Sequence, residues 1–105
     1  MNLIKQNQIF GEIMDFYSNE CRKSKEDIIE AKGSNKILLV VLICILKKDM
    51  GFSTGFLSEE FKCDKKDVFS MQATLDISKK AKNNSMYSET YEYAREKILK
   101  EFKND

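Results

Sequence analysis

Residues 53–75 read STGFLSEEFKCDKKDVFSMQATL, and this stretch decides the fold that we expect. It predicts a short helix over residues 54–61, a turn at residues 62–63, and a longer helix that begins after Asp64. Asp is a residue type that favours the position just before a helix. Two helices joined by so short a turn have the outline of a helix-turn-helix, here about residues 53–82. Such a unit places its second helix in the major groove of DNA.

Both predicted helices carry apolar residues at helical spacing. In the first, which Ser53 or Thr54 can cap, they are Phe56, Leu57 and Phe61; in the second they are Val68, Met71 and Leu75, to which Phe69 can add. A stripe of this kind packs on a neighbouring element, so we expect the pair to dock on the rest of the domain.

The most apolar run of the chain precedes this unit. Residues 37–46 read ILLVVLICIL, which fits a buried strand as well as a buried helix. No second strand is visible to pair with it, so we favour a central, buried helix. Ser34 is the expected N-cap, Lys47 and Lys48 suit the C-terminus, and Gly51 marks the stop. A bilayer span needs about 20 apolar residues, so we expect no membrane segment and a cytoplasmic location.

The remaining segments also indicate helices. Residues 4–20 carry a broad apolar face, a short helix begins at Ser24 with Asp27 in its first turn, and a last helix covers about residues 88–102. The chain has no proline and only four glycines. The sequence therefore predicts an all-α single domain over residues 1–105, with five to six helices, a helix-turn-helix and a buried central helix.

Composition limits the chemistry that we expect. The chain has no histidine, which is the usual general base and the commonest metal ligand. Its three cysteines, Cys21, Cys44 and Cys63, are widely spaced and form no CxxC pair. We therefore expect reduced thiols, no metal, no cofactor, no catalytic residue and no enzymatic activity. The formal net charge of +1 is low for a protein that binds DNA through phosphate neutralisation.

Over residues 9–102 the pattern resembles the C-terminal DNA-binding domain of the bacterial chromosomal replication initiator DnaA. The residues that carry the resemblance are Ile9, Ile13, Phe16 and Tyr17, the segment 26–29, the apolar run 37–46, Leu57 and Phe61, and Val68, Met71 and Leu75. The resemblance implies the fold described above and contact with duplex DNA at two places.

The first of these places is the loop and start of the central helix, where the family inserts an arginine into the minor groove. The arginine position falls on Leu39 here, and Lys32, Asn35 and Lys36 lie nearby. The second place is the family's RDHTT block at the start of the recognition helix. It corresponds to residues 64–67, DKKD, without histidine or threonine.

We therefore expect contact with the phosphate backbone of duplex DNA rather than base reading. The candidate residues are Lys32, Asn35, Lys36, Lys62, Lys65 and Lys66. Residues 62–82 hold six lysines and three aspartates, an excess that predicts only moderate, salt-sensitive affinity.

A second interpretation stays open, namely a protein-interaction module or small inhibitor that keeps the fold. The loop over residues 51–55 is flanked by Met50, Phe52 and Phe56, which would offer an apolar contact if exposed and would otherwise pack beneath the loop. On the last helix, Tyr87 and Tyr91 suit the edge of the core, whereas Tyr93 lies off their stripe. A mixed-sign surface with an apolar patch would favour this interpretation over DNA binding.

Overall fold

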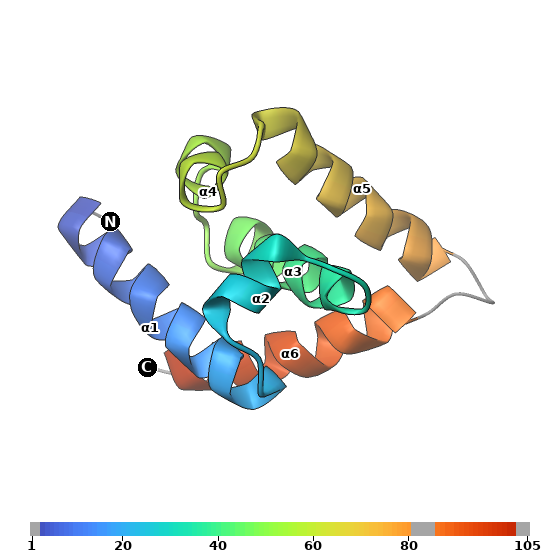
Figure 1. The fold of residues 1–105 in the computed structure, drawn as a ribbon, viewed down its shortest axis with the longest axis horizontal. Coiled ribbons are helices and arrows are strands. Elements are labelled where there is room, and N and C mark those ends of the chain that lie inside the picture. The colour runs from blue at the N-terminus through green and yellow to red at the C-terminus, as the bar shows by residue number, and fades with distance from the viewer. Residues whose placement is uncertain (1–2, 81–85, 103–105) are drawn as a thin grey trace.

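The computed structural model describes residues 3–80 and 86–102, which form six α-helices and no strand (Figure 1). The helices are α1 (Leu3–Cys21), α2 (Lys25–Glu30), α3 (Asn35–Cys44), α4 (Thr54–Glu60), α5 (Lys65–Lys80) and α6 (Met86–Phe102). A π-helical turn, Ile45–Asp49, continues α3 without a break. The all-α class with five to six helices is thereby confirmed.

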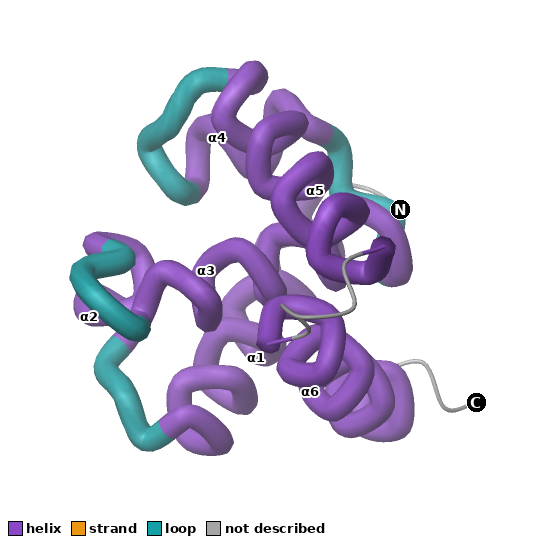
Figure 2. The backbone as a smooth tube through the Cα atoms, turned by 90° about the vertical axis from the view of Figure 1, so that its right-hand side faces the viewer, coloured by secondary structure: helices purple, strands orange, loops and turns teal. Residues whose placement is uncertain are grey.

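Helix α3 lies at the centre of the fold, as its composition predicts. Residues 39–46 are all buried, and the helix contacts α2, α5 and α6. Figure 1 shows α3 between α5 and α6, and Figure 2, turned by 90°, shows these two helices next to each other, where they also contact one another. Because this helix is apolar around its whole circumference, it can bury every face only by being surrounded in this way.

The end of α3 differs from a simple helix stop. The Met50 N–H donates to the Ile45 carbonyl at 3.0 Å, which closes one wide π-helical turn, and the Phe52 N–H donates to the Leu46 carbonyl at 2.9 Å. Gly51 then turns the chain with φ +78°, a left-handed conformation that glycine adopts without strain. The predicted stop at Gly51 is confirmed, whereas the π-helical turn before it was not predicted.

Two serine caps are confirmed. Ser24 Oγ accepts from the Asp27 N–H and Ser53 Oγ accepts from the Phe56 N–H, each at 3.1 Å. Each bond satisfies one of the N–H groups that a helix start leaves unpaired.

Two other helix starts are built differently. Ser34 occupies the N-cap position of α3, as predicted, but its side chain makes no capping hydrogen bond. The carbonyls of residues 32–34, which form a turn, accept from the first three N–H groups of the helix instead. At the start of α5, the Asp64 N–H donates to Asp67 Oδ2 at 3.1 Å. Asp64 does precede the helix, but the observed bond is the reverse half of a capping box.

Four phenylalanines pack α1 against α4 and against the loop that precedes α4. The Phe10 ring meets Phe52, Phe56 and Phe61 edge-on, with ring centroids 6.1, 5.4 and 5.7 Å apart. Phe52 is only 1% exposed, so it packs beneath the loop and cannot contact a partner while the fold is intact. Met50 and Phe56 are half-buried. Of the two alternatives that the sequence left open for this loop, packing beneath it is the one observed for Phe52, which is thereby removed from the possible partner contacts.

Candidate interaction surface on helix α5

The structure brings together the two segments that we predicted to contact DNA. The turn between α4 and α5 lies beside α2 and the start of α3, because residues of these elements line two shared grooves. The lysines at positions 32, 36, 62, 65 and 66 are exposed, and Asn35 is half-buried. The charges of the neighbouring side chains decide how well these residues would suit an anion.

The first groove is acidic. It has a volume of about 330 Å³ and is lined by Glu26, Ile29, Glu30, Glu60 and Lys62. Glu30 also pairs with Lys32, whose Nζ lies 3.7 Å from Oε2. Three carboxylates around one lysine disfavour a phosphate here, because like charges repel at this range.

The second groove is less acidic, with one lysine and one aspartate in its lining, so it disfavours an anion less than the first. It has a volume of about 230 Å³ and is lined by Lys36, Val40, Cys63, Asp67, Ser70, Met71 and Thr74. Among the described residues, Lys36, Lys65 and Lys66 form no ion pair. Leu39, which we expected at the position of the DNA-contacting arginine, is only 6% exposed and faces the core.

The solvent-facing side of α5 is the feature that the sequence did not single out. Phe69 is 57% exposed and Ile77 is 68% exposed, and Ala73 between them is exposed as well. These three residues are spaced i, i+4 and i+8, so they form one stripe along the helix. The possible burial of Phe69 is thereby corrected. We call Phe69, Ala73 and Ile77 the α5 stripe.

The α5 stripe is exposed because the opposite side of the helix is the one that packs on α3. Val68, Leu75 and Ser78 are buried, and the Cys44 thiol donates to the Met71 carbonyl at 3.6 Å. Figure 1 shows α5 along one edge of the molecule. No described element covers the outer side of the helix.

Lysines flank the α5 stripe at both ends. Lys66 lies one turn before Phe69 and Lys80 lies one turn after Ile77, and both are exposed. The nearest carboxylate on the helix, Asp76, pairs with Lys48 across the α3–α5 contact, with Oδ1 3.8 Å from Nζ. The outer side of α5 is therefore apolar in its middle and basic at its ends.

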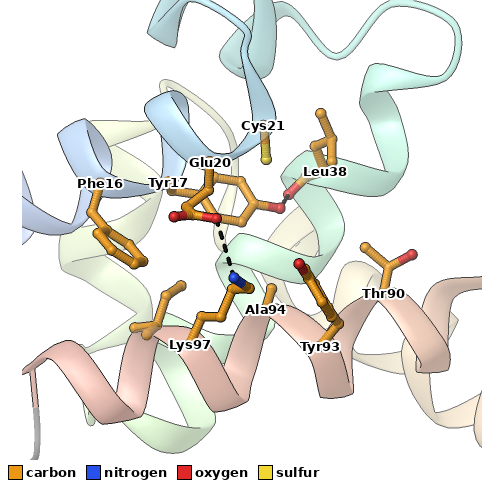
Figure 3. A pocket seen from close by; sticks show the side chains of 10 residues that line it. Phe16, Tyr17, Glu20, Cys21, Leu38, Thr90, Tyr93, Ala94 and Lys97 are labelled. Atoms are coloured by element: carbon orange, nitrogen blue, oxygen red, sulfur yellow. Dashed lines mark hydrogen bonds and ion pairs between the residues drawn. The ribbon is translucent and has the colours of Figure 1, made fainter.

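A small cavity between α1 and α6 has a different character (Figure 3). It has a volume of about 170 Å³ and mostly apolar walls, including Phe16, Leu38 and Ile98. At its rim, Lys97 Nζ lies 3.5 Å from Glu20 Oε2. Ligand pockets usually enclose about 300 Å³ or more. We therefore interpret this smaller cavity as a packing gap at the edge of the core and not as a ligand site.

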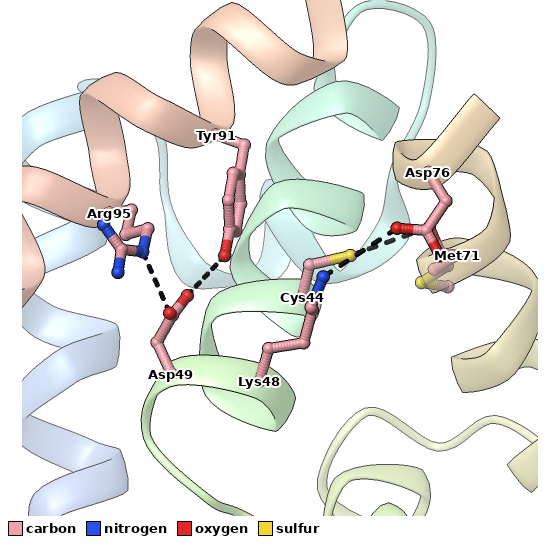
Figure 4. Close-up of polar contacts among 7 residues, drawn as sticks. All are labelled: Cys44, Lys48, Asp49, Met71, Asp76, Tyr91 and Arg95. Atoms are coloured by element: carbon pink, nitrogen blue, oxygen red, sulfur yellow. Dashed lines mark hydrogen bonds and ion pairs between the residues drawn. The ribbon is translucent and has the colours of Figure 1, made fainter. Parts of the chain in front are cut away.

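A polar cluster joins the π-helical turn to α6 (Figure 4). The Tyr91 hydroxyl donates to Asp49 Oδ2 at 2.6 Å, and Arg95 Nε donates to Asp49 Oδ1 at 2.9 Å. Burial, and then the hydrogen bond to Asp49, raise the pKa of Tyr91 well above its ordinary value. The cluster fixes α6 against the end of the central helix.

The thiols are not activated. Burial raises the pKa of Cys44 to about 12. Burial, followed by the charges of Asp67 and Asp64, also raises the pKa of Cys63. A raised pKa lowers the thiolate fraction at neutral pH, so neither side chain is suited to nucleophilic chemistry.

Neither a metal-binding cluster nor a membrane-spanning helix is found in the part of the chain that the structure describes. Residues 3–80 and 86–102 contain no cluster of three or more His, Cys, Asp or Glu side chains placed to hold a metal ion. None of the described helices is long and apolar enough to cross a lipid bilayer.

Comparisons with known proteins add no assignment. No protein-family model, no curated protein and no solved structure matches this chain.

Proposed function

We propose that this chain is a small binding protein without enzymatic activity, and that it acts by docking another protein on the outer side of α5. The observation that carries the proposal is the α5 stripe, in which two large apolar side chains, Phe69 and Ile77, are more than half exposed in one line. Exposed apolar residues scattered singly need no explanation, whereas an aligned set on one helix is typical of a contact surface.

The charges near this surface also favour a protein partner. The groove beside Lys62 holds three glutamates, and Asp64 and Asp67 lie at the start of α5. A DNA site gains most of its affinity from an excess of positive charge. A surface of mixed sign next to an apolar patch is what protein interfaces present.

The proposal is tested by affinity capture from the native host, with the full chain as bait. Phe69→Ala combined with Ile77→Ala should lose a protein that the wild type retains after nuclease treatment. The matched control is Ile4→Ala, which removes an 81% exposed side chain from α1 and should leave the captured set unchanged. If the double variant captures the same proteins as the wild type, α5 is not the docking surface.

Contact with duplex DNA is a second candidate, favoured by the absence of ion pairs at Lys36, Lys65 and Lys66 among the described residues. The resemblance to the replication initiator's DNA-binding domain supports it. Because Leu39 is buried, contact would be limited to phosphates.

Fluorescence anisotropy on mixed-sequence duplex at low salt decides this second candidate. Binding that is lost on Lys65→Glu with Lys66→Glu would support it. Failure to bind at about 50 mM salt, where phosphate contacts are strong, would exclude it.

A further inference from the structure

We propose that the occupant of the α5 stripe is an amphipathic helix with acidic ends. This inference rests on the proposed function and specifies the chemistry of the protein partner. It follows from three properties of the outer side of α5: the length of its apolar part, the size of its central residue and the sign of the charges at its ends.

The length of the apolar part fits one face of a short helix. Phe69 and Ile77 are separated by eight residues, which is about 12 Å along the helix axis. A partner helix that lies along α5 would cover this length with apolar residues at i, i+4 and i+7. Three anchors at this spacing are how an amphipathic helix docks in an apolar groove.

The residue sizes indicate how the helices would meet. Ala73 lies between the two large side chains and leaves a shallow gap in the middle of the stripe. Helices pack by placing the side chains of one into the gaps of the other. The partner's central apolar residue should therefore be large, such as leucine, and should sit over Ala73.

The lysines at the ends of the α5 stripe indicate that the partner helix has acidic ends. Lys66 and Lys80 are exposed one turn beyond the α5 stripe, about 21 Å apart, and neither forms an ion pair among the described residues. Asp76, which lies between them, is already paired with Lys48. Carboxylates at the two ends of a partner helix would meet these lysines, whereas basic ends would be repelled.

The same charges disfavour a second copy of this chain as the occupant. An antiparallel pair of α5 helices centred on Ala73 would place Phe69 against Ile77 of the second copy, which is favourable. It would also place Lys66 against Lys80 at both ends, and a parallel pair would align each lysine with itself. Like charges in direct opposition weaken such a pair.

The test uses the full chain and two designed helical peptides that differ only in charge. Both carry leucine at the three apolar positions; one has glutamates at the ends and the other has lysines. Fluorescence anisotropy should show the acidic peptide binding about tenfold or more tightly than the basic one. Replacing the central leucine of the acidic peptide by alanine should weaken its binding severalfold.

Charge reversal on the protein should reverse this preference. Lys66→Glu with Lys80→Glu should make the basic peptide the tighter ligand. Lys23→Glu with Lys100→Glu changes the net charge equally at exposed positions off α5 and should leave the preference as in the wild type. Thermal unfolding of both variants verifies that each is folded.

The other outcomes separate this inference from the proposed function. Equal binding of both peptides, lost on Phe69→Ala, would overturn the acidic partner and leave α5 as a protein-docking surface. Binding of duplex DNA but of neither peptide would overturn both. A dimer of the free protein that Phe69→Ala dissociates would identify a second copy as the occupant and overturn the acidic partner. Failure of the acidic peptide to bind would overturn the inference, and the capture experiment would still decide the proposed function.

Discussion

The hydrogen bond between Tyr91 and Asp49 provides the sharpest test of how the fold is held together. Tyr91 is 3% exposed, and its hydroxyl donates to a carboxylate that also accepts from Arg95. Tyr91→Phe removes the hydroxyl and keeps the ring, over which Lys79 Nζ lies 4.7 Å from the centroid. A hydrogen bond to a charged group contributes about 1.5–3 kcal/mol to stability, and the net contribution is usually at the lower end when some solvent reaches the acceptor.

We therefore expect Tyr91→Phe to lower the free energy of unfolding by about 1.5 kcal/mol, which for a domain of this size lowers Tm by roughly 6–12 °C. Urea denaturation followed by far-UV circular dichroism measures the effect. Two further tyrosines supply an internal scale. Tyr17→Phe removes a 2.6 Å hydrogen bond to the neutral Leu38 carbonyl and should destabilise by about 1 kcal/mol. Tyr93, 64% exposed, should tolerate phenylalanine within about 0.5 kcal/mol.

The role of charge is isolated by repeating the substitution in an Asp49→Asn background. The amide still accepts a hydrogen bond, so the effect of Tyr91→Phe should fall to about that of Tyr17→Phe, near 1 kcal/mol. A Tyr91→Phe destabilisation no larger than that of Tyr93→Phe would show that the hydrogen bond does not stabilise the fold. An unchanged Tyr91→Phe effect in the Asp49→Asn background would show that the charge of Asp49 does not contribute to it.

Three further predictions concern packing, backbone and pH. Phe10→Ala should destabilise the fold by about 2–4 kcal/mol because three rings pack on Phe10, whereas the same change at exposed Phe69 should stay within about 0.5 kcal/mol in urea denaturation. Gly11→Ala, inside α1 with nothing within 4 Å of the added Cβ, should stabilise by about 0.5–1 kcal/mol, and Gly51→Ala at φ +78° should destabilise by about 1 kcal/mol or more. The pKa of Cys44 is raised from 9.0 to about 12 in the fold, so the stability that the protonated thiol contributes is fully present below pH 9 and is lost between pH 9 and 12. As the pH rises through that window, the free energy of unfolding should fall by up to about 1.4 kcal/mol per pH unit, and Cys44→Ala should make this slope shallower.

Much of the fold is predictable from this sequence because its signals are local and strong. The run of residues 37–46 leaves only the choice between a buried strand and a buried helix, and the lack of a second strand decides for the helix. Ser24 and Ser53 each stand directly before a helix, and each side chain accepts from an N–H group in the first turn that has no partner within the helix. The Ser34 side chain makes no such bond, because backbone carbonyls of the preceding turn already accept from the first N–H groups of α3. In that turn Gly33 adopts a φ of +59°. The glycine indicates a turn in the sequence, but it does not show which groups satisfy the first N–H groups of α3.

The candidate surface was harder to predict because α5 carries two apolar stripes. Val68, Met71 and Leu75 have helical spacing, and Phe69, Ala73 and Ile77 have it too, about half a turn away. Periodicity alone shows that each stripe has something to pack against, and it does not show which of them faces the core. The position of α3 decides: it covers the first stripe and leaves the second exposed. The α5 helix needs only one apolar side to pack on the core, so its second apolar side stays exposed. The free-energy cost of keeping Phe69 and Ile77 in water is proportional to the apolar area that they expose. A partner helix that covers the α5 stripe would remove that penalty, which is why we place the function of the chain on this helix.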